Sequence, residues 1–339
     1  MKDAMVKWRY TVITHTDLDG IAAAAVYLRL AGAKLGIDAV VHFAEPYKLC
    51  KVLNQIDVSS TTRVAIMDLG PNATIFGDVV ERLKELIRHG VIVEWYDHHR
   101  WYGEWVNQLK DIGVHLYIDT STCATGVVAK YAVEELDAQL DEHIKELVAA
   151  TCSADLWRWD HPLSTKLYRV VDRYKGRKGD SWKRKLIIGF SEGSLWWPEL
   201  DEALEEYLKL EFEGFAKALR NVIVGSKAGC RFAVVLKHPG PPAASIIGNS
   251  LIDRYNADFV VIVRRGGSKG ISFRSKTVNV REIAVKLGGG GHPRAAGAPL
   301  DMPWWARLVA RLYPRYKLAY TAKLIEKVLG EIGCPRLSD

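Results

Sequence analysis

Residues 10–20 read Tyr-Thr-Val-Ile-Thr-His-Thr-Asp-Leu-Asp-Gly. The apolar run Tyr10–Ile13 predicts a buried strand, and the apolar-rich segment Ile21–Leu30 predicts the helix that follows it. A His-x-Asp-x-Asp motif, residues 15–19, therefore lies where a strand ends and a helix begins. Carboxylates and imidazoles are common protein ligands of divalent metal ions, so the motif is a candidate metal site.

The first half of the chain repeats this strand-and-helix pattern. Further strands are predicted at Ala39–Phe43, Val64–Met67 and Val91–Tyr96, and a helix at about Gly77–His89. Such alternation is typical of a parallel sheet covered by helices, in which ligands bind outside the carboxyl ends of the strands. Asp68 and the triplet Asp97-His98-His99 directly follow two of these strands, so we expect them at the same sheet edge as residues 15–19.

Three longer helices are predicted next, at residues 124–136, 142–156 and 199–221. The Thr/Ser-rich residues 119–122 are expected to cap the first, and the second carries Asp155 near its end. The basic segment 173–185 contains two glycines and predicts an exposed loop.

A second pattern begins near residue 226. Strands are predicted at residues 231–236, 258–263 and 270–274, helices at 243–255 and 280–287, and a Trp- and Arg-rich helical tail ends the chain. A chain of 339 residues usually needs more than one core. We therefore predict an α/β protein with an N-terminal parallel-sheet domain at residues 1–195, a helical connector at 196–225 and a smaller C-terminal α/β domain at 226–339.

The composition is that of an ordinary globular protein, with 48% hydrophobic and 26% charged residues. No run of eighteen or more apolar residues and no signal-peptide pattern is present, so we expect no membrane span and a cytoplasmic location. The net charge of +7 fits either simple solubility or a polyanionic substrate. The five cysteines are widely spaced, which predicts neither a disulfide framework nor a structural zinc site.

The acidic residues after the strands predict a site for two metal ions. Asp17 and Asp19 are two residues apart, so both side chains point to one side of an extended segment. Asp68 could bridge the two ions, and His98 would add nitrogen ligation. Mixed nitrogen and oxygen ligands suit Mn²⁺ best, with Mg²⁺, Co²⁺ or Zn²⁺ as alternatives. A single acid of this kind could equally be a helix cap or a turn residue.

A glycine-rich segment near the end of the chain predicts a phosphate site. Residues 288–291 are four consecutive glycines, whose backbone N–H groups can surround an anion. His292 and Arg294 follow, and Arg274 and Ser275 lie on the preceding predicted strand, which adds charged donors and hydroxyls. The alternative is a flexible turn with incidental charges.

These motifs, in this order, resemble the DHH phosphoesterase superfamily in its branch with a C-terminal DHHA1 domain, which includes RecJ-like exonucleases and NrnA-like oligoribonucleases. The resemblance covers nearly the whole chain. It is carried by the motif at residues 15–20, by Asp68, by Asp97-His98-His99, by Asp155 after an apolar helix and by Gly289-Gly290-Gly291-His292.

The resemblance implies roles for individual residues. His15, Asp17 and Asp68 would hold one Mn²⁺, and Asp19, His98 and Asp155 the other, with Asp68 shared. His99 would face the scissile phosphate, and Asp97 would orient the imidazoles. The expected phosphate-binding residues, in a cleft between the domains, are Arg274, Ser275, Gly290, Gly291, His292 and Arg294.

We therefore expect a Mn²⁺-dependent phosphodiesterase that uses two ions and an activated water to release mononucleotides from an end of short or single-stranded nucleic acid. A small-nucleotide hydrolase, either a pAp phosphatase or a cyclic-dinucleotide phosphodiesterase, is the alternative within the enzyme class. A non-catalytic RecJ-like replication partner is the alternative outside it. Homodimerisation and docking on a replication or repair complex are further expectations.

Overall fold

The structure is a computed structural model that describes residues 8–265 and 270–337. The chain divides into two compact units, residues 1–204 and residues 205–339. Among the described residues, no helix is both long enough and apolar enough to cross a membrane.

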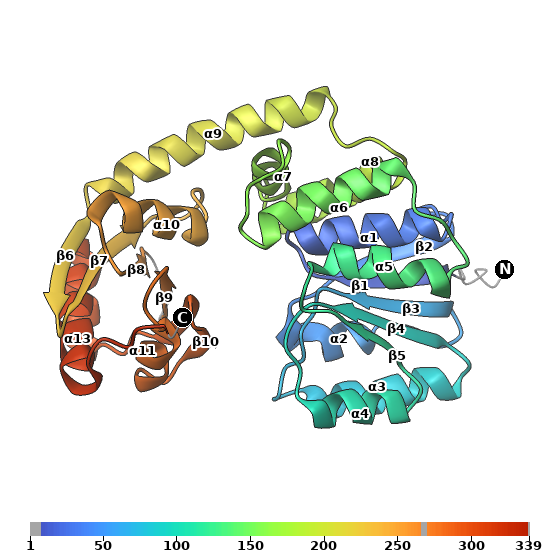
Figure 1. Cartoon of the computed structure of the whole chain (residues 1–339), viewed down its shortest axis with the longest axis horizontal. Helices are drawn as coiled ribbons and strands as arrows, with labels where there is room; N and C mark the ends of the chain where they lie inside the picture. The colour runs from blue at the N-terminus through green and yellow to red at the C-terminus, as the bar shows by residue number, and fades with distance from the viewer. Residues whose placement is uncertain (1–7, 266–269, 338–339) are drawn as a thin grey trace. The chain divides into compact units, whose positions relative to one another are not determined.

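The first unit contains a five-stranded parallel sheet in the order β2-β1-β3-β4-β5 (Figure 1). Its strands are β1 (Trp8–Thr14), β2 (Ala39–Phe43), β3 (Thr61–Met67), β4 (Ile92–Asp97) and β5 (His115–Ile118). The prediction of a parallel sheet built by strand-and-helix alternation is confirmed. The strand order reverses between β1 and β3, and ligand sites of such sheets form at this switch point.

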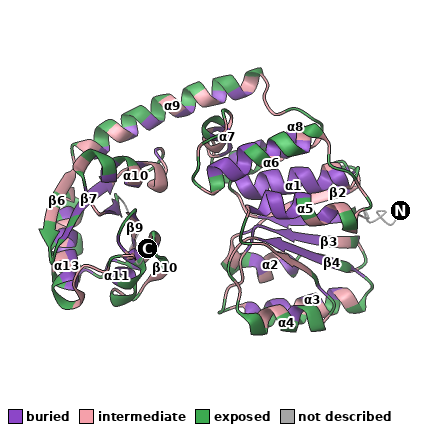
Figure 2. Ribbon diagram, viewed as in Figure 1, coloured by how far each residue is buried: buried purple, intermediate pink, exposed green. Residues whose placement is uncertain are grey.

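Helices cover both faces of this sheet (Figure 1). One face carries α1 (Leu18–Leu30), α5 (Ala124–Glu135), α6 (Glu142–Asp155), α7 (Ser164–Val171) and α8 (Gly176–Ser191). The other carries α2 (Leu49–Leu53), α3 (Phe76–Arg88) and α4 (Gly103–Asp111), and the short helix η1 (Pro46–Lys48) precedes α2. Successive strand residues point to opposite faces, so Val12 packs in the first core and Ile13 in the second. The sheet and the inner faces of α1 and α5 are accordingly buried (Figure 2).

The predicted exposed loop at residues 173–185 is wrong, because most of this segment belongs to α8. Its side chains Trp182, Leu186, Ile187 and Phe190 repeat at helical spacing and are buried against the first core. Trp182 also donates its indole N–H to the carbonyl of Val170 at 2.7 Å. The basic residues from Arg177 to Lys185 therefore lie on a packed helix.

The second unit is a six-stranded mixed sheet with helices. Its order is β10-β11-β9-β8-β7-β6, and only the pair β7 and β8 is parallel among its described strands. The strands are β6 (Val222–Lys227), β7 (Cys230–Lys237), β8 (Phe259–Arg264), β9 (Gly270–Ser275), β10 (Gly290–His292) and β11 (Ala295–Pro299). The helices are α10 (Ala244–Tyr255), α11 (Val280–Lys286), α12 (Trp304–Leu312) and α13 (Pro314–Ile332), and α9 (Pro198–Leu219) precedes them. The predicted second α/β region is confirmed.

Two disulfides contradict the prediction that the cysteines form no such bonds. Cys123 is bonded to Cys152, and Cys230 to Cys334, with sequence separations of 29 and 104 residues. Cys50 remains a free thiol. Wide spacing along the chain does not predict distance in space, because the fold brings the start of α5 onto α6 and the start of β7 near the end of α13.

Candidate metal centre

Four segments converge at the carboxyl ends of β1, β3 and β4. Asp17 and Asp19 lie at the start of α1, Asp68 follows β3, His98 follows β4, and Asp155 is the last residue of α6. The side chains of these residues, with His15 and His99, form three overlapping groups that could hold a metal ion. The groups are His15, Asp17 and Asp68; Asp19, His98 and Asp155; and Asp68, His98 and His99.

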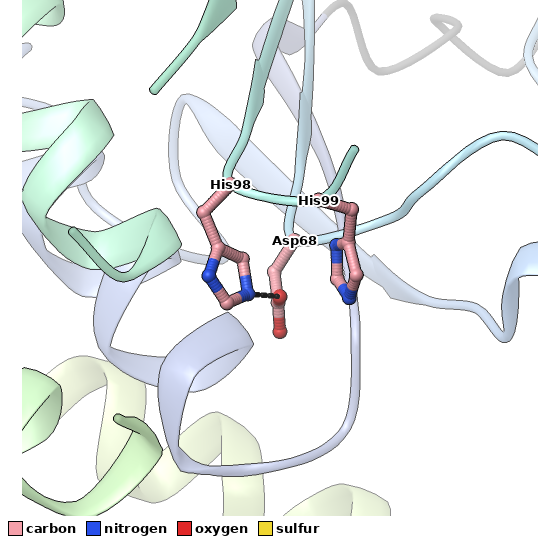
Figure 3. A group of neighbouring side chains, drawn as sticks. All are labelled: Asp68, His98 and His99. Carbon is pink, nitrogen blue, oxygen red and sulfur yellow. Dashed lines mark ion pairs between the residues drawn. The ribbon is translucent and has the colours of Figure 1, made fainter. Parts of the chain in front are cut away.

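Within each of these groups, the candidate ligand atoms lie within 4.8 Å of one another. His15 Nδ1 lies 2.9 Å from Asp17 Oδ2 and 3.6 Å from Asp68 Oδ2. His98 Nε2 lies 3.5 Å from Asp68 Oδ1, and His98 Nδ1 lies 3.7 Å from Asp155 Oδ2. Figure 3 shows the Asp68 carboxylate between the rings of His98 and His99. Asp68 thus adjoins both histidines and belongs to two of the three groups.

Asp68 itself shows that the cluster suits a cation. Its carboxylate is only 4% exposed, and its Oδ2 atom has no hydrogen-bond partner among the described residues. A buried carboxylate oxygen without a hydrogen bond is costly; its neighbour His15 Nδ1 stays at 3.6 Å, and a metal ion would satisfy the oxygen directly. Asp68 also has a positive φ of 53°, a conformation that aspartate and asparagine tolerate better than other side chains.

The start of α1 holds Asp17 and His15 in place. Asp17 is the N-cap of this helix and accepts a hydrogen bond from the backbone N–H of Gly20 at 3.2 Å. Asp17 is therefore a helix cap, which was the alternative to metal binding for a single acid, and this role is compatible with metal binding. A Cβ atom at Gly20 would lie 2.5 Å from the carbonyl oxygen of His15, so only glycine lets the helix approach this loop so closely.

Asp19 is held by the N-terminus of a different helix, α5. Its buried carboxylate accepts hydrogen bonds from the N–H groups of Ala124 at 2.7 Å and Thr125 at 2.8 Å. The hydroxyl of Thr125 donates to the same carboxylate at 2.6 Å. The cap predicted at residues 119–122 is therefore wrong: Cys123 is the N-cap without a side-chain bond, and Asp19 satisfies the first turn from outside.

The Cys123–Cys152 disulfide joins the supports of two candidate ligands. Cys123 immediately precedes the α5 turn that binds Asp19, and Cys152 is one helical turn before Asp155 on α6. The cross-link therefore fixes the helix that orients Asp19 to the helix that carries Asp155.

The ionisation of the cluster shows a shortage of positive charge. Burial and the nearby carboxylates of Asp17 and Asp19 raise the pKa of Asp68 to about 7. Burial and the charge of Asp19 raise the pKa of Asp155 to about 8. Burial lowers the pKa of His98, but the hydrogen bond with Asp68 and the charges of Asp19 and Asp155 outweigh it and raise this pKa to about 10. Bound cations would replace these protons.

Asp97 and Trp101 orient His99. The Asp97 carboxylate is fully buried, lies 2.8 Å from His99 Nδ1 and accepts the indole N–H of Trp101 at 2.6 Å. This contact directs His99 Nδ1 toward Asp97 and leaves Nε2 as the outward nitrogen. Burial lowers the pKa of His99, but the hydrogen bond and charge of Asp97 outweigh it and raise the pKa.

The predicted phosphate-binding residues all lie in the second unit. Gly290, Gly291 and His292 form β10, and Arg294 is in the turn to β11. A Cβ atom at Gly289 would lie 2.1 Å from the carbonyl oxygen of Gly297, so close strand packing requires part of the glycine run. His292 and Arg294 are exposed.

Arg274 and Ser275 end β9 and differ in how far they are engaged. The Arg274 guanidinium donates to the carbonyl of Phe273 at 2.8 Å, and Gly248 on α10 leaves room for its side chain. The buried Ser275 hydroxyl donates to the carbonyl of Asp258 at 2.9 Å and accepts the N–H of Val278 at 2.8 Å. The Ser275 hydroxyl is therefore engaged by the turn after β9, and it does not belong to the proposed phosphate site.

Sequence reasoning missed three side chains of the centre. Thr125 binds Asp19, Trp101 binds Asp97, and Glu45 Oε2 lies 3.5 Å from His15 Nε2. The proximity of Trp101 to the Asp-His-His triplet in sequence was the available signal for that residue. Nothing local to Thr125 or Glu45 indicates the contact.

Comparison with known proteins agrees with this architecture. A family model of the DHHA1 domain matches residues 233–306. The chain is 24% identical over 322 residues to oligoribonuclease NrnB of Bacillus subtilis (strain 168), which covers 90% of this chain and 76% of that protein.

Two solved structures share the fold. The pGpG-specific phosphodiesterase PggH from Vibrio cholerae superposes with a TM-score of 0.56 at 16% identity, covering 93% of this chain and 99% of that one. RecJ from Thermus thermophilus, solved with Mn²⁺, gives a TM-score of 0.57 at 17% identity, covering 96% of this chain and 53% of that one.

The fold combines a parallel sheet that carries acids at its switch point with a region that matches the DHHA1 domain. The chain carries a match to the DHHA1 domain at residues 233–306, and as a whole it resembles the DHH phosphoesterase superfamily in its branch with this C-terminal domain.

Proposed function

We propose that the protein is a Mn²⁺-dependent phosphodiesterase that releases mononucleotides from an end of short or single-stranded nucleic acid. The observation that carries this proposal is the pair of candidate ligand groups at one sheet edge, which adjoin through Asp68 and His98. Similarity to an oligoribonuclease and the fold shared with RecJ support a nucleic-acid substrate. The mixed nitrogen and oxygen ligands, and the Mn²⁺ in the RecJ structures, support manganese over Mg²⁺ or Co²⁺.

The two ligand groups divide the proposed metal binding. His15, Asp17 and Asp68 would hold one ion, and Asp19, His98 and Asp155 would hold the other, with Asp68 available to both. When bound, two divalent ions lower the pKa of a water molecule and neutralise charge on a phosphoryl group.

His99 and Asp97 of the first unit position the scissile phosphate in this proposal. The contact between Asp97 and His99 Nδ1 fixes the ring, so that His99 Nε2 can donate a hydrogen bond to an oxygen of the scissile phosphate. Asp97 acts through His99 and is a positioning residue. Its own orientation depends on the Trp101 indole.

The second unit supplies the proposed phosphate contacts. Arg274, His292 and Arg294 provide charge-assisted donors, and the N–H groups of Gly290 and Gly291 add uncharged ones. For the side chain of Arg294, the described part of the chain shows no ion pair or hydrogen bond, which suits a group reserved for an anion.

The decisive experiment compares initial rates on a dinucleotide, 20-mer RNA, 20-mer DNA, pAp and cyclic di-AMP in the presence of Mn²⁺. Mononucleotide release from the dinucleotide or the 20-mers supports the proposal. Hydrolysis of pAp or of cyclic di-AMP alone contradicts it and assigns the small-nucleotide alternative. Absence of hydrolysis with Mn²⁺, Mg²⁺ and Co²⁺ on all five substrates favours the non-catalytic replication partner, although all predicted metal ligands are present in this chain.

A further inference from the structure

A cavity of about 530 Å³ opens beside His99 in the first unit. We call it the outer pocket. Its walls come from the loop after β4, from α4, from β5 and from α5, and the residues used below are His99, Arg100, Trp101, Lys110, Tyr117 and Tyr131. Pockets of this size hold small ligands in other proteins. Because His99 forms part of both the pocket wall and the candidate centre, whatever fills the pocket lies next to the reacting phosphate.

The charges of the outer pocket favour an anion. Arg100 and Lys110 line it, and no carboxylate does. Both cations are exposed, and within residues 8–265 and 270–337 neither has a recorded ion pair or hydrogen bond of its side chain. The exposed Lys130 on the neighbouring α5 is engaged, by contrast, with Asp119 at 2.7 Å. Two unpaired cations beside a phosphoryl site provide charge for a second phosphate.

The aromatic wall favours a nucleobase. Tyr117 stacks between Tyr96 and Tyr131, with ring centroids 5.1 Å apart on each side, so it presents only its edge to the pocket and supports the ring of Tyr131. Trp101 is fixed by its hydrogen bond to Asp97 and by edge contact with Trp95 at 5.0 Å. These rings are held before any ligand arrives, and preorganised aromatic surfaces bind bases of any sequence.

We propose that the outer pocket binds the nucleotide on the far side of the scissile phosphate, with its base against the aromatic wall and its next phosphate on Arg100 and Lys110. This inference rests on the proposed nuclease function. It defines the substrate class further: in chains of at least three nucleotides, the enzyme also recognises the nucleotide and the phosphate beyond the scissile bond. A dinucleotide offers no phosphate at this position.

The test measures binding of the whole chain without turnover. In EDTA, unlabelled di- and tetranucleotides compete with a fluorescein-labelled tetranucleotide, followed by anisotropy, at several salt concentrations. The wild type is expected to prefer the tetranucleotide. The R100A/K110A variant is expected to lose about tenfold of that preference. Its slope of log affinity against log salt is expected to fall by about 0.7, because the two cations bind a single phosphate and each single-strand phosphate contact contributes about 0.7.

The matched control is R88A, which removes an exposed arginine of α3 that does not line the pocket. A preference for the tetranucleotide that is unchanged in R100A/K110A, or equally reduced in R88A, overturns the inference. A change of oligomeric state in R100A/K110A, measured by light scattering, also overturns it and assigns this sheet edge to a second copy of the chain.

These outcomes are separate from failure of the proposed function. If the pocket inference alone is wrong, wild-type protein still hydrolyses the tetranucleotide with Mn²⁺. If the function is wrong, no oligonucleotide is hydrolysed whatever the binding result.

Discussion

Removal of the Cys123–Cys152 disulfide is expected to destabilise the first unit by about 3.6 kcal/mol. The bond closes a loop with a sequence separation of 29 residues, and the loop-entropy relation gives about 12 cal/mol/K for that length. Alanine is the suitable replacement, because both cysteines are buried and serine would bring a hydroxyl into the core. In a unit of this size, each kcal/mol lowers the melting temperature by about 2–4 °C, so the expected shift is about 7–14 °C.

Differential scanning calorimetry of metal-free C123A/C152A protein measures this shift. The matched control is C230A/C334A, whose bond has a separation of 104 residues and lies in the second unit. That variant is expected to lose about 4.7 kcal/mol from the second unit and to leave the first transition in place. Wild-type protein that is denatured, reduced and refolded without reoxidation should show both lowered transitions, as in a variant that combines the two pairs of substitutions. A first transition that does not move in C123A/C152A would refute the reasoning.

Three further predictions concern the metal centre. D68N removes the charge of the proposed shared ligand but keeps a residue type that tolerates the positive φ. Turnover of every phosphoester substrate should therefore fall at least about 100-fold, while the melting temperature of the metal-free protein stays the same. A variant with wild-type turnover contradicts the shared role. T125V removes the hydroxyl bond to Asp19, which should weaken Mn²⁺ binding by roughly 10- to 100-fold in calorimetric titration, whereas T120V, which does not contact Asp19, should not. In protein kept at a free Mn²⁺ concentration about 100 times the dissociation constant, removal of Mn²⁺ with EDTA should lower the stability of the first unit by about 2.7 kcal/mol for each bound ion. The second transition should stay unchanged, and its movement instead would place the metal elsewhere.

The regular elements of both units follow from local sequence pattern. The apolar run at the start of the chain and the alternation after it predict β1, β3, β4 and the acids at their ends, because these signals lie within a few residues of one another. Segment 173–185 was wrongly predicted as a loop, because two glycines and many basic residues outnumber the apolar residues within these thirteen positions. The apolar residues that bury α8 continue to Phe190, beyond this segment.

Contacts distant in sequence could not be predicted in this way. Thr125 lies 106 residues from Asp19, and the disulfides span 29 and 104 residues, so no local pattern records these pairs. The hydroxyl of Ser275 shows the opposite case. Its sequence position suits phosphate binding, but tertiary packing directs it to the backbone of Asp258.

The positive φ of Asp68 restricts how this position can evolve. Glutamate would keep the negative charge, but its longer side chain is disfavoured in the left-handed conformation, and asparagine would fit the backbone but lose the charge. No single substitution keeps both properties. Under the proposed function, every replacement at this residue therefore loses either charge for the metal ions or compatibility with the backbone.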